Sequence, residues 1–177
     1  AAVEGSEFSF RLRLPRAEAP EATPSEAPAA PGERLAGLTL LVVEDNANNQ
    51  QVAQELLEYE GALVSLAGDG QQALDMLRAA PLAYDLVLMD VQMPVMDGYA
   101  ATRAIRAEPS LAHLPVVAIT ANAMAVDRLA ARAAGMDAHV GKPFELEHLV
   151  AVIRHQLGRH PVPVAAAPQL PARDWSA

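Results

Sequence analysis

Residues 37–157 alternate five times between a short apolar run and a longer segment in which apolar side chains recur at helical spacing. The first run, 38–43, is apolar except for Thr39, which is typical of a strand covered on both faces. Five successive strand-then-helix units predict an α/β fold with a doubly wound, five-stranded parallel sheet. The expected strands are 38–43, 61–66, 84–89, 115–120 and 138–141, and the expected helices are 46–59, 69–77, 98–107, 123–134 and 144–157.

Two proline-rich segments flank this patterned region. Residues 15–36 combine several of the chain's 14 prolines with Ala, Glu, Ser and Thr, and residues 158–177 are rich in Pro and Ala. Neither segment has the hydrophobic period that is needed to bury a core. We therefore expect a semi-stiff linker at 15–36, one domain at 37–157, and a frayed tail or second linker at 158–177.

The composition excludes several classes of protein. The formal net charge of −9 argues against a nucleic-acid-binding surface, which needs a basic stripe. The absence of cysteine excludes a disulfide scaffold and a thiolate metal site, and it fits a reducing compartment. The sequence has no apolar run of the roughly 18 residues that span a bilayer, and we expect no signal peptide, because no basic stretch leads into an apolar one near residue 1. We expect a cytoplasmic domain without direct contact with nucleic acid or membrane, compatible with a longer parent protein anchored in the inner membrane.

Charged and hydroxyl side chains stand where the predicted strands end. Glu44 and Asp45 follow the first strand, and Asp90 follows the third. Thr120 ends the fourth, and Lys142, the only lysine in the chain, follows the fifth. Taken singly, each residue has an ordinary explanation as a turn residue, a helix cap or an exposed side chain. Their joint placement predicts a site, because ligands bind outside the carboxyl ends of parallel strands near a topological switch point.

Three acids at one edge of a sheet suit a divalent cation. Mg²⁺ takes oxygen ligands and keeps several of its waters. We expect Asp45 and Asp90 to supply one carboxylate oxygen each, the backbone carbonyl of Gln92 to supply a third ligand, and Glu44 to hold a water of the hydration shell. The cation would relieve the mutual repulsion of the acids and neutralise phosphate oxygens.

Asp90 is the candidate nucleophile of a phosphoryl transfer. Aspartate can attack phosphorus and form an acyl phosphate, and catalysis of this transfer is mostly positioning and charge stabilisation. Lys142 is expected to pair with Asp90 at rest and with the phosphoryl group afterwards. Thr120 is expected to offer its hydroxyl to a phosphoryl oxygen.

Four sequence motifs then make the chain recognisable. They are VEDN at 43–46, LMDVQMPVMDG at 88–98, ITANA at 119–123 and GKPF at 141–144. Over residues 37–157 the chain resembles the receiver domain of two-component response regulators. The residues within and around these motifs are most similar to those of receivers that are fused to hybrid sensor histidine kinases.

The resemblance implies a (βα)₅ flavodoxin-like fold and a role for each matching residue. Asp90 is similar to the phosphoacceptor, Glu44 and Asp45 match the metal-binding acidic pair, and Lys142 matches the phosphate-sensing lysine. Thr120 matches the switch hydroxyl. It also implies a cis bond between Lys142 and Pro143. A second switch position, usually aromatic, is occupied here by His139, and this departure leaves the side-chain switch open.

The same resemblance implies partners for a phosphorelay. The phosphoryl group would come from phosphohistidine on a histidine kinase domain, in the same polypeptide or its dimer mate. It would pass from Asp90 to a histidine phosphotransfer domain or to water. The chain alone is expected to catalyse only its own aspartyl phosphorylation and dephosphorylation, because it lacks ATP-binding motifs and a phosphoacceptor histidine.

Residues 1–14 admit two readings. Their alternating pattern resembles the last strand of a histidine kinase ATP-binding domain, and the alternation continues through Leu14. The stretch GSEF at 5–8 is also a common vector remnant. We expect the kinase remnant and keep the cloning scar as the alternative.

Two functions from other classes fit the same fold. A phosphohydrolase of the haloacid dehalogenase type also forms an aspartyl phosphate with Mg²⁺, but it needs a second acid two residues after the nucleophile, where this chain has Gln92. A flavodoxin-like binding module needs a phosphate loop after the first strand, and Glu44 and Asp45 would repel a phosphate there. A degenerate receiver that serves only as a docking surface is a further, lesser alternative.

Overall fold

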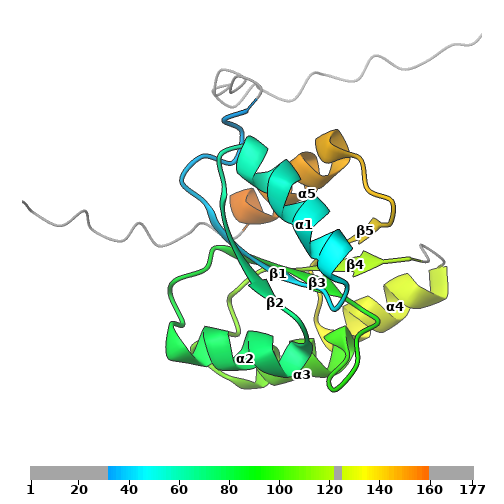
Figure 1. Ribbon diagram of the computed structural model, residues 1–177. Coiled ribbons are helices and arrows are strands. Elements are labelled where there is room, and N and C mark those ends of the chain that lie inside the picture. Colours follow the sequence, from blue (N-terminus) through cyan, green and yellow to red (C-terminus); the bar gives the residue numbers. More distant parts are fainter. Residues whose placement is uncertain (1–31, 122–124, 160–177) are drawn as a thin grey trace, which may run out of the picture.

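The computed structural model describes residues 32–121 and 125–159 and contains a five-stranded parallel sheet in the order β2-β1-β3-β4-β5 (Figure 1). This order confirms the predicted doubly wound, flavodoxin-like fold. The strands are β1 (Thr39–Val43), β2 (Leu63–Ala67), β3 (Leu86–Asp90), β4 (Val116–Thr120) and β5 (Ala138–Gly141). The helices are α1 (Ala47–Tyr59), α2 (Gly70–Ala79), α3 (Gly98–Ala107), α4 (Ala125–Ala134) and α5 (Leu146–Arg159).

Every element boundary lies within two residues of the predicted one. The second strand begins at Leu63 rather than at Gly61, because Gly61 has a φ of +88° and belongs to the turn after α1. Residues 123–124, where the fourth helix was expected to begin, lie outside the described residues, as do residues 1–14 and most of the two flanking segments. Among the helices of the described ranges, we found none with the length and apolarity that crossing a membrane requires.

The central strands are apolar throughout because both of their faces are covered. Helices α1 and α5 lie on one face of the sheet, and α2, α3 and α4 lie on the other (Figure 1). Side chains alternate between the faces along a strand. In β1, Leu40 and Val42 therefore join the core beneath α1 and α5, while Leu41 and Val43 join the core beneath the other three helices.

The topology places the switch point between β1 and β3. Strand β1 pairs with β2 on one side and with β3 on the other. Val43 lies opposite Met89 in this register. Glu44 and Asp90 are the next residues along their strands, so they leave the sheet side by side at its carboxyl edge.

The boundary predicted between the linker and the domain, at residue 36, lies too late in the chain. Residues 32–36 pack against the domain: Leu35 is fully buried, and Arg34 binds the buried Glu60 at the end of α1 with Nη2–Oε1 and Nε–Oε2 distances of 2.5 and 2.8 Å. The backbone amide of Gly32 also donates to Glu60. The composition of 15–36 concealed this contact, because one buried leucine leaves no periodic signal.

Replacing Glu60 by glutamine is expected to lower the free energy of unfolding at neutral pH and to flatten its loss in acid. The hydrogen bond from the Arg34 guanidinium holds the pKa of Glu60 below its ordinary value. A glutamate has a pKa of about 4.3 in the unfolded chain. At pH values above this pKa, the ion pair contributes its full amount to the free energy of unfolding. The contribution is lost as the pH falls through the lower pKa that Glu60 has in the folded chain.

Urea unfolding at neutral and acidic pH measures both effects. Glu33→Gln, an exposed neighbour of Arg34, serves as the control. Equal acid sensitivity of Glu60→Gln and the unchanged chain would show that the pair contributes nothing to this pH dependence.

Candidate functional site

Three carboxylates meet at the carboxyl edge of β1 and β3. Glu44, Asp45 and Asp90 each offer one oxygen, and these oxygens all lie within 4.8 Å of one another. Glu44 and Asp90 are buried, with 3% and 5% of their surface exposed, and Asp45 is exposed. The sheet thus brings together residues 45 positions apart in the chain, as their placement at strand ends predicted.

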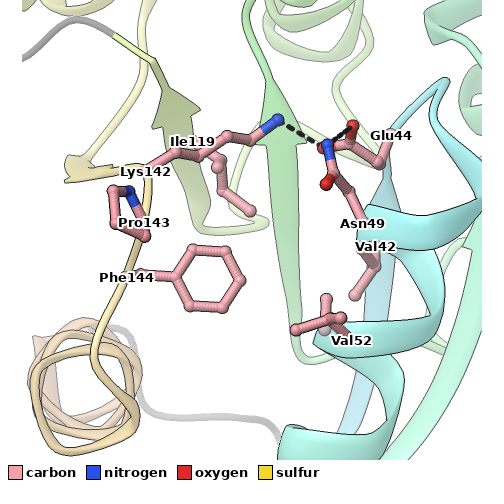
Figure 2. A pocket seen from close by; sticks show the side chains of 9 residues that line it. Val42, Glu44, Asn49, Val52, Ile119, Lys142, Pro143 and Phe144 are labelled. Atoms are coloured by element: carbon pink, nitrogen blue, oxygen red, sulfur yellow. Dashed lines mark hydrogen bonds and ion pairs between the residues drawn. The ribbon is translucent and has the colours of Figure 1, made fainter.

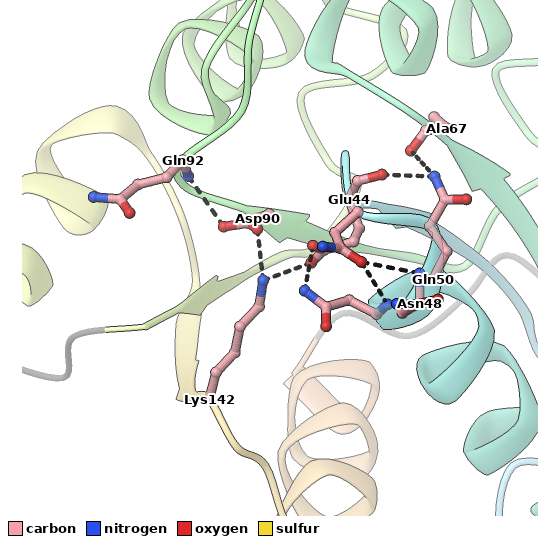
Figure 3. A network of polar contacts seen from close by, with 9 residues as sticks. Glu44, Asn48, Gln50, Ala67, Asp90, Gln92 and Lys142 are labelled. Carbon is pink, nitrogen blue, oxygen red and sulfur yellow. Dashed lines mark hydrogen bonds and ion pairs between the residues drawn. The ribbon is translucent and has the colours of Figure 1, made fainter.

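Lys142 reaches into this cluster from the segment that follows β5 (Figure 3). Its Nζ donates to Asp90 Oδ2 and to Glu44 Oε2, each at 2.6 Å. Its backbone amide donates to the carbonyl of Thr120 at 2.7 Å, which ties the segment to β4. Burial by itself lowers the pKa of Lys142, but the hydrogen bonds to Asp90 and Glu44 outweigh it and raise the pKa above the ordinary lysine value, so the side chain stays an ammonium.

The backbone around Asp90 and Glu44 is fixed by further hydrogen bonds. The amide of Gln92 donates to Asp90 Oδ1 at 3.0 Å, so both oxygens of Asp90 have donors. The amide of Glu44 donates to the Ala67 carbonyl at 3.0 Å, and Gln50 Nε2 donates to the Glu44 carbonyl at 2.6 Å (Figure 3). The carboxylates are therefore held before any ligand arrives.

Two hollows border the cluster. An open pocket of about 440 Å³ is lined by Asp45 and Gln92, together with the loop between β3 and α3. A second pocket, of about 250 Å³, lies between α1 and the segment after β5, and its apolar wall includes Val52 and Phe144 (Figure 2). The first hollow leaves room for a ligand beside Asp45.

The remaining predicted site residues are Thr120, Pro143 and His139, and they differ in how they lie relative to the three acids. Thr120 ends β4 in the buried layer, next to the segment that carries Lys142. The Lys142–Pro143 peptide bond is cis, the isomer that the resemblance implies. His139 lies apart from the acids, in a pocket that it lines with Arg128 and other residues of α4 and β5, and burial and the charge of Arg128 lower its pKa. The ligand role of the Gln92 carbonyl, the hydroxyl role of Thr120 and the switch role of His139 stay predictions.

Sequence reasoning missed three residues that shape the site. Asn49 and Gln50, in the first turn of α1, bind the side chain and the backbone of Glu44. Gly98, the first residue of α3, approaches β3 so closely that a Cβ there would lie 2.2 Å from the Asp90 carbonyl oxygen. For Asn49 and Gln50 the available signal was their place just after the helix-capping Asn46.

The donor set fits Mg²⁺. Carboxylate and carbonyl oxygens are the ligands that this ion prefers, and no thiolate is present in the sequence to favour a softer metal. Three acids against one ammonium leave a negative excess that a cation neutralises. The arrangement combines a buried carboxylate, an adjacent fixed ammonium and an open hollow, which is what an aspartyl phosphorylation site requires.

Replacing Lys142 by methionine is expected to destabilise the metal-free domain and to enlarge the stabilisation that Mg²⁺ gives. The side chains of Glu44 and Asp90, only 4% and 7% exposed, would lose the ammonium that both of them bind. Mg²⁺ restores a cation, so the gain in melting temperature on adding Mg²⁺ should exceed that of the unchanged chain.

Thermal unfolding in EDTA and in Mg²⁺ gives the two values. Arg103→Met removes an exposed cation from α3 and serves as the control. A Mg²⁺ response of Lys142→Met no larger than that of Arg103→Met would contradict the prediction.

Comparison with known proteins agrees with this geometry. Residues 40–154 match the response regulator receiver domain. The sensor histidine kinase GacS of Pseudomonas protegens is 41% identical over 146 residues, covering 80% of this chain and 16% of GacS. The hybrid signal transduction histidine kinase I of Dictyostelium discoideum is 37% identical over 134 residues, covering 73% of this chain and 8% of that protein. The chain thus spans less than a fifth of either relative.

A solved structure is similar over the whole domain. The receiver domain of the sensor histidine kinase PA1611 from Pseudomonas aeruginosa PAO1 is 41% identical, with a TM-score of 0.64, over 70% of this chain and 99% of that one. That crystal structure has a magnesium ion coordinated in its active site cleft. From the motifs, the sheet order and these matches together, the chain belongs to the response regulator receiver domain family, in the form that histidine kinases carry.

Proposed function

We propose that this receiver domain accepts a phosphoryl group from phosphohistidine onto Asp90 with the help of Mg²⁺. The observation that carries the proposal is the buried Asp90 carboxylate, bound by Lys142 Nζ at 2.6 Å and lying within 4.8 Å of two further acids. Asp45, Asp90 and the backbone carbonyl of Gln92 are the groups that would hold the ion. The magnesium ion in the similar Pseudomonas aeruginosa structure supports this choice of metal.

The transfer needs only a nucleophile and fixed charges from the chain. A carboxylate oxygen of Asp90 attacks phosphorus, the phosphorus–nitrogen bond to the donor histidine breaks, and the imidazole keeps the electron pair. When bound, Mg²⁺ neutralises charge on the phosphoryl oxygens. Lys142 stays beside the acyl phosphate, and its fixed position lowers the cost of the charge that collects there.

The phosphoryl group leaves Asp90 by one of two routes. Attack by a histidine of a phosphotransfer domain forms a phosphorus–nitrogen bond, and attack by water releases inorganic phosphate. In both, the bond between phosphorus and the Asp90 oxygen breaks, and the carboxylate is regenerated. We assign Thr120 the contact with a phosphoryl oxygen, since it ends the strand beside Asp90. His139 would follow as the second moving side chain, and the two together shift the population between two surface states.

The donor is proposed to be a histidine kinase domain of the same polypeptide or of its dimer mate, because the similar proteins are histidine kinases. Residues 1–14 are proposed to be the remnant of that kinase's ATP-binding domain. The cysteine-free composition supports a cytoplasmic location for this domain, within a parent protein anchored in the inner membrane.

Incubation of the purified chain with acetyl phosphate and Mg²⁺, followed by mass spectrometry, tests the proposal. We expect one phosphoryl group, mapped to Asp90 and released by hydroxylamine as an acyl phosphate should be. Labelling at another residue, or no labelling in Mg²⁺, would refute it. Repeated turnover of phosphomonoesters would point instead to a phosphohydrolase, and copurified flavin to a flavodoxin-like module.

A further inference from the structure

The first turn of α1 sends one side chain back toward the acids. Asn46 caps the helix, and its side chain accepts hydrogen bonds from the amides of Asn48 and Asn49. A Glu or Gln at the position of Asn49, the third of the helix, commonly accepts a hydrogen bond from the backbone amide of the capping residue. Here Asn49 Nδ2 instead donates to Glu44 Oε1 at 2.7 Å, past the cap (Figure 2).

Glu44 is consequently held from two sides. Oε1 accepts from Asn49 on α1, and Oε2 accepts from Lys142 after β5 at 2.6 Å. The side chain is 4% exposed, so water has little access to it. A separate donor on each oxygen of a buried carboxylate restricts its rotation, which fixes the face that it presents to Asp45 and Asp90.

The two donors differ in what they contribute. The Lys142 ammonium supplies charge, and it is shared between Glu44 and Asp90. The Asn49 amide is neutral, so it adds direction without competing with a cation for the negative charge of the cluster. An amide donor at this place favours a carboxylate that is oriented yet still able to attract Mg²⁺.

We propose that Asn49 is a positioning residue for the Mg²⁺ site and acts through Glu44. The proposal rests on the proposed function, because it assigns Asn49 to the metal site of that function. Among the hydrogen bonds of the described residues, Asp90 accepts from Lys142 and from the Gln92 amide, and the Asn49 amide donates to Glu44. Removal of the Asn49 amide should therefore weaken Mg²⁺ binding without slowing phosphoryl transfer once the metal is saturating. Partners of metal ligands commonly change metal affinity about tenfold or more. Asn49 acts one contact further out, through a carboxylate that would hold a metal-bound water, so we expect an effect of up to about tenfold.

Mg²⁺ titration of the full chain, followed by NMR amide shifts, measures the affinity independently of activity. Asn49→Ala is expected to raise the Mg²⁺ dissociation constant severalfold, up to about tenfold. Its acetyl phosphate reaction should reach the rate of the unchanged chain at saturating Mg²⁺. Asn48→Ala, an exposed neighbour of the same type on the same helix, should leave the dissociation constant unchanged.

A double-mutant cycle separates positioning from general support of the fold. If Asn49 acts through Glu44, Asn49→Ala should have no further effect on Mg²⁺ affinity in a Glu44→Ala background. If Glu44→Ala does not fold, as its melting in EDTA will show, the comparison of the two asparagine variants decides the matter.

The outcomes distinguish this proposal from the function on which it rests. The unchanged chain could bind Mg²⁺ and be phosphorylated on Asp90 while Asn49→Ala and Asn48→Ala have the same Mg²⁺ dissociation constant. That result would overturn only the role of Asn49. A lower melting temperature of Asn49→Ala with an unchanged dissociation constant would do the same. Failure of the unchanged chain to bind Mg²⁺ would overturn both proposals.

Discussion

Replacing Asp90 by asparagine is expected to abolish acyl phosphate formation and to remove most of the stabilisation that Mg²⁺ gives to the domain. The amide lacks the carboxylate that attacks phosphorus, and it takes one negative charge from the three acids that meet within 4.8 Å. For the unchanged chain, free Mg²⁺ at about 100 times its dissociation constant contributes about 2.7 kcal/mol of stability. Mass spectrometry after acetyl phosphate treatment and thermal unfolding with and without Mg²⁺ check the two effects.

Two further variants show whether the effects of Asp90→Asn come from loss of the nucleophile or from loss of a negative charge. Asp45→Asn removes an acid but leaves the nucleophile, so it should still form the acyl phosphate while requiring more Mg²⁺. Asp75→Asn changes an exposed acid on α2 and should behave as the unchanged chain in both measurements. Phosphorylation of Asp90→Asn at the normal level would place the acceptor elsewhere and end the assignment.

The sequence predicted the fold and the meeting of the acids because both follow from regular patterns. An apolar run such as Leu40–Val43 has side chains in both cores, and this is visible as a strand without polar alternation. Parallel strands align their carboxyl ends, and β1 and β3 are neighbours, so Glu44 and Asp90 leave the sheet side by side. Lys142 follows β5 at the same edge, and its long side chain spans the distance to the acids.

The features that the sequence did not predict depend on the direction of single side chains. Leu35 is one apolar residue in a proline-rich segment, and nothing local shows that it enters the core. The Asn49 side chain donates a hydrogen bond to Glu44 rather than bonding the backbone of its own helix. Which of the two it bonds depends on where the β1–α1 loop lies in the folded domain. The contact between Gly98 and β3 likewise depends on how closely α3 packs, which periodicity does not encode.

Replacing Gly98 by alanine is expected to destabilise the domain by about 3 kcal/mol or more and to slow phosphorylation of Asp90. The new Cβ would lie 2.2 Å from the Asp90 carbonyl oxygen and 3.0 Å from Met89 Cγ. Gly98 cannot easily withdraw, since its amide donates to the Val91 carbonyl at 3.1 Å and its carbonyl accepts from the buried Thr102 at 2.7 Å. Relief of the overlap therefore requires α3 to move away from β3 or the backbone of Asp90 to shift.

A second helical glycine provides the matched control for this overlap. A Cβ on Gly158 in α5 would meet no atom within 4 Å, so Gly158→Ala should be neutral or should stabilise by up to about 1 kcal/mol through helix propensity. Urea unfolding gives both free energies, and the acetyl phosphate reaction at saturating Mg²⁺ gives the rates. Equal stability of the two variants would mean that the packing of α3 against β3 tolerates the added Cβ. Normal phosphorylation by a destabilised Gly98→Ala would show that α3, and not the backbone of Asp90, absorbs the displacement.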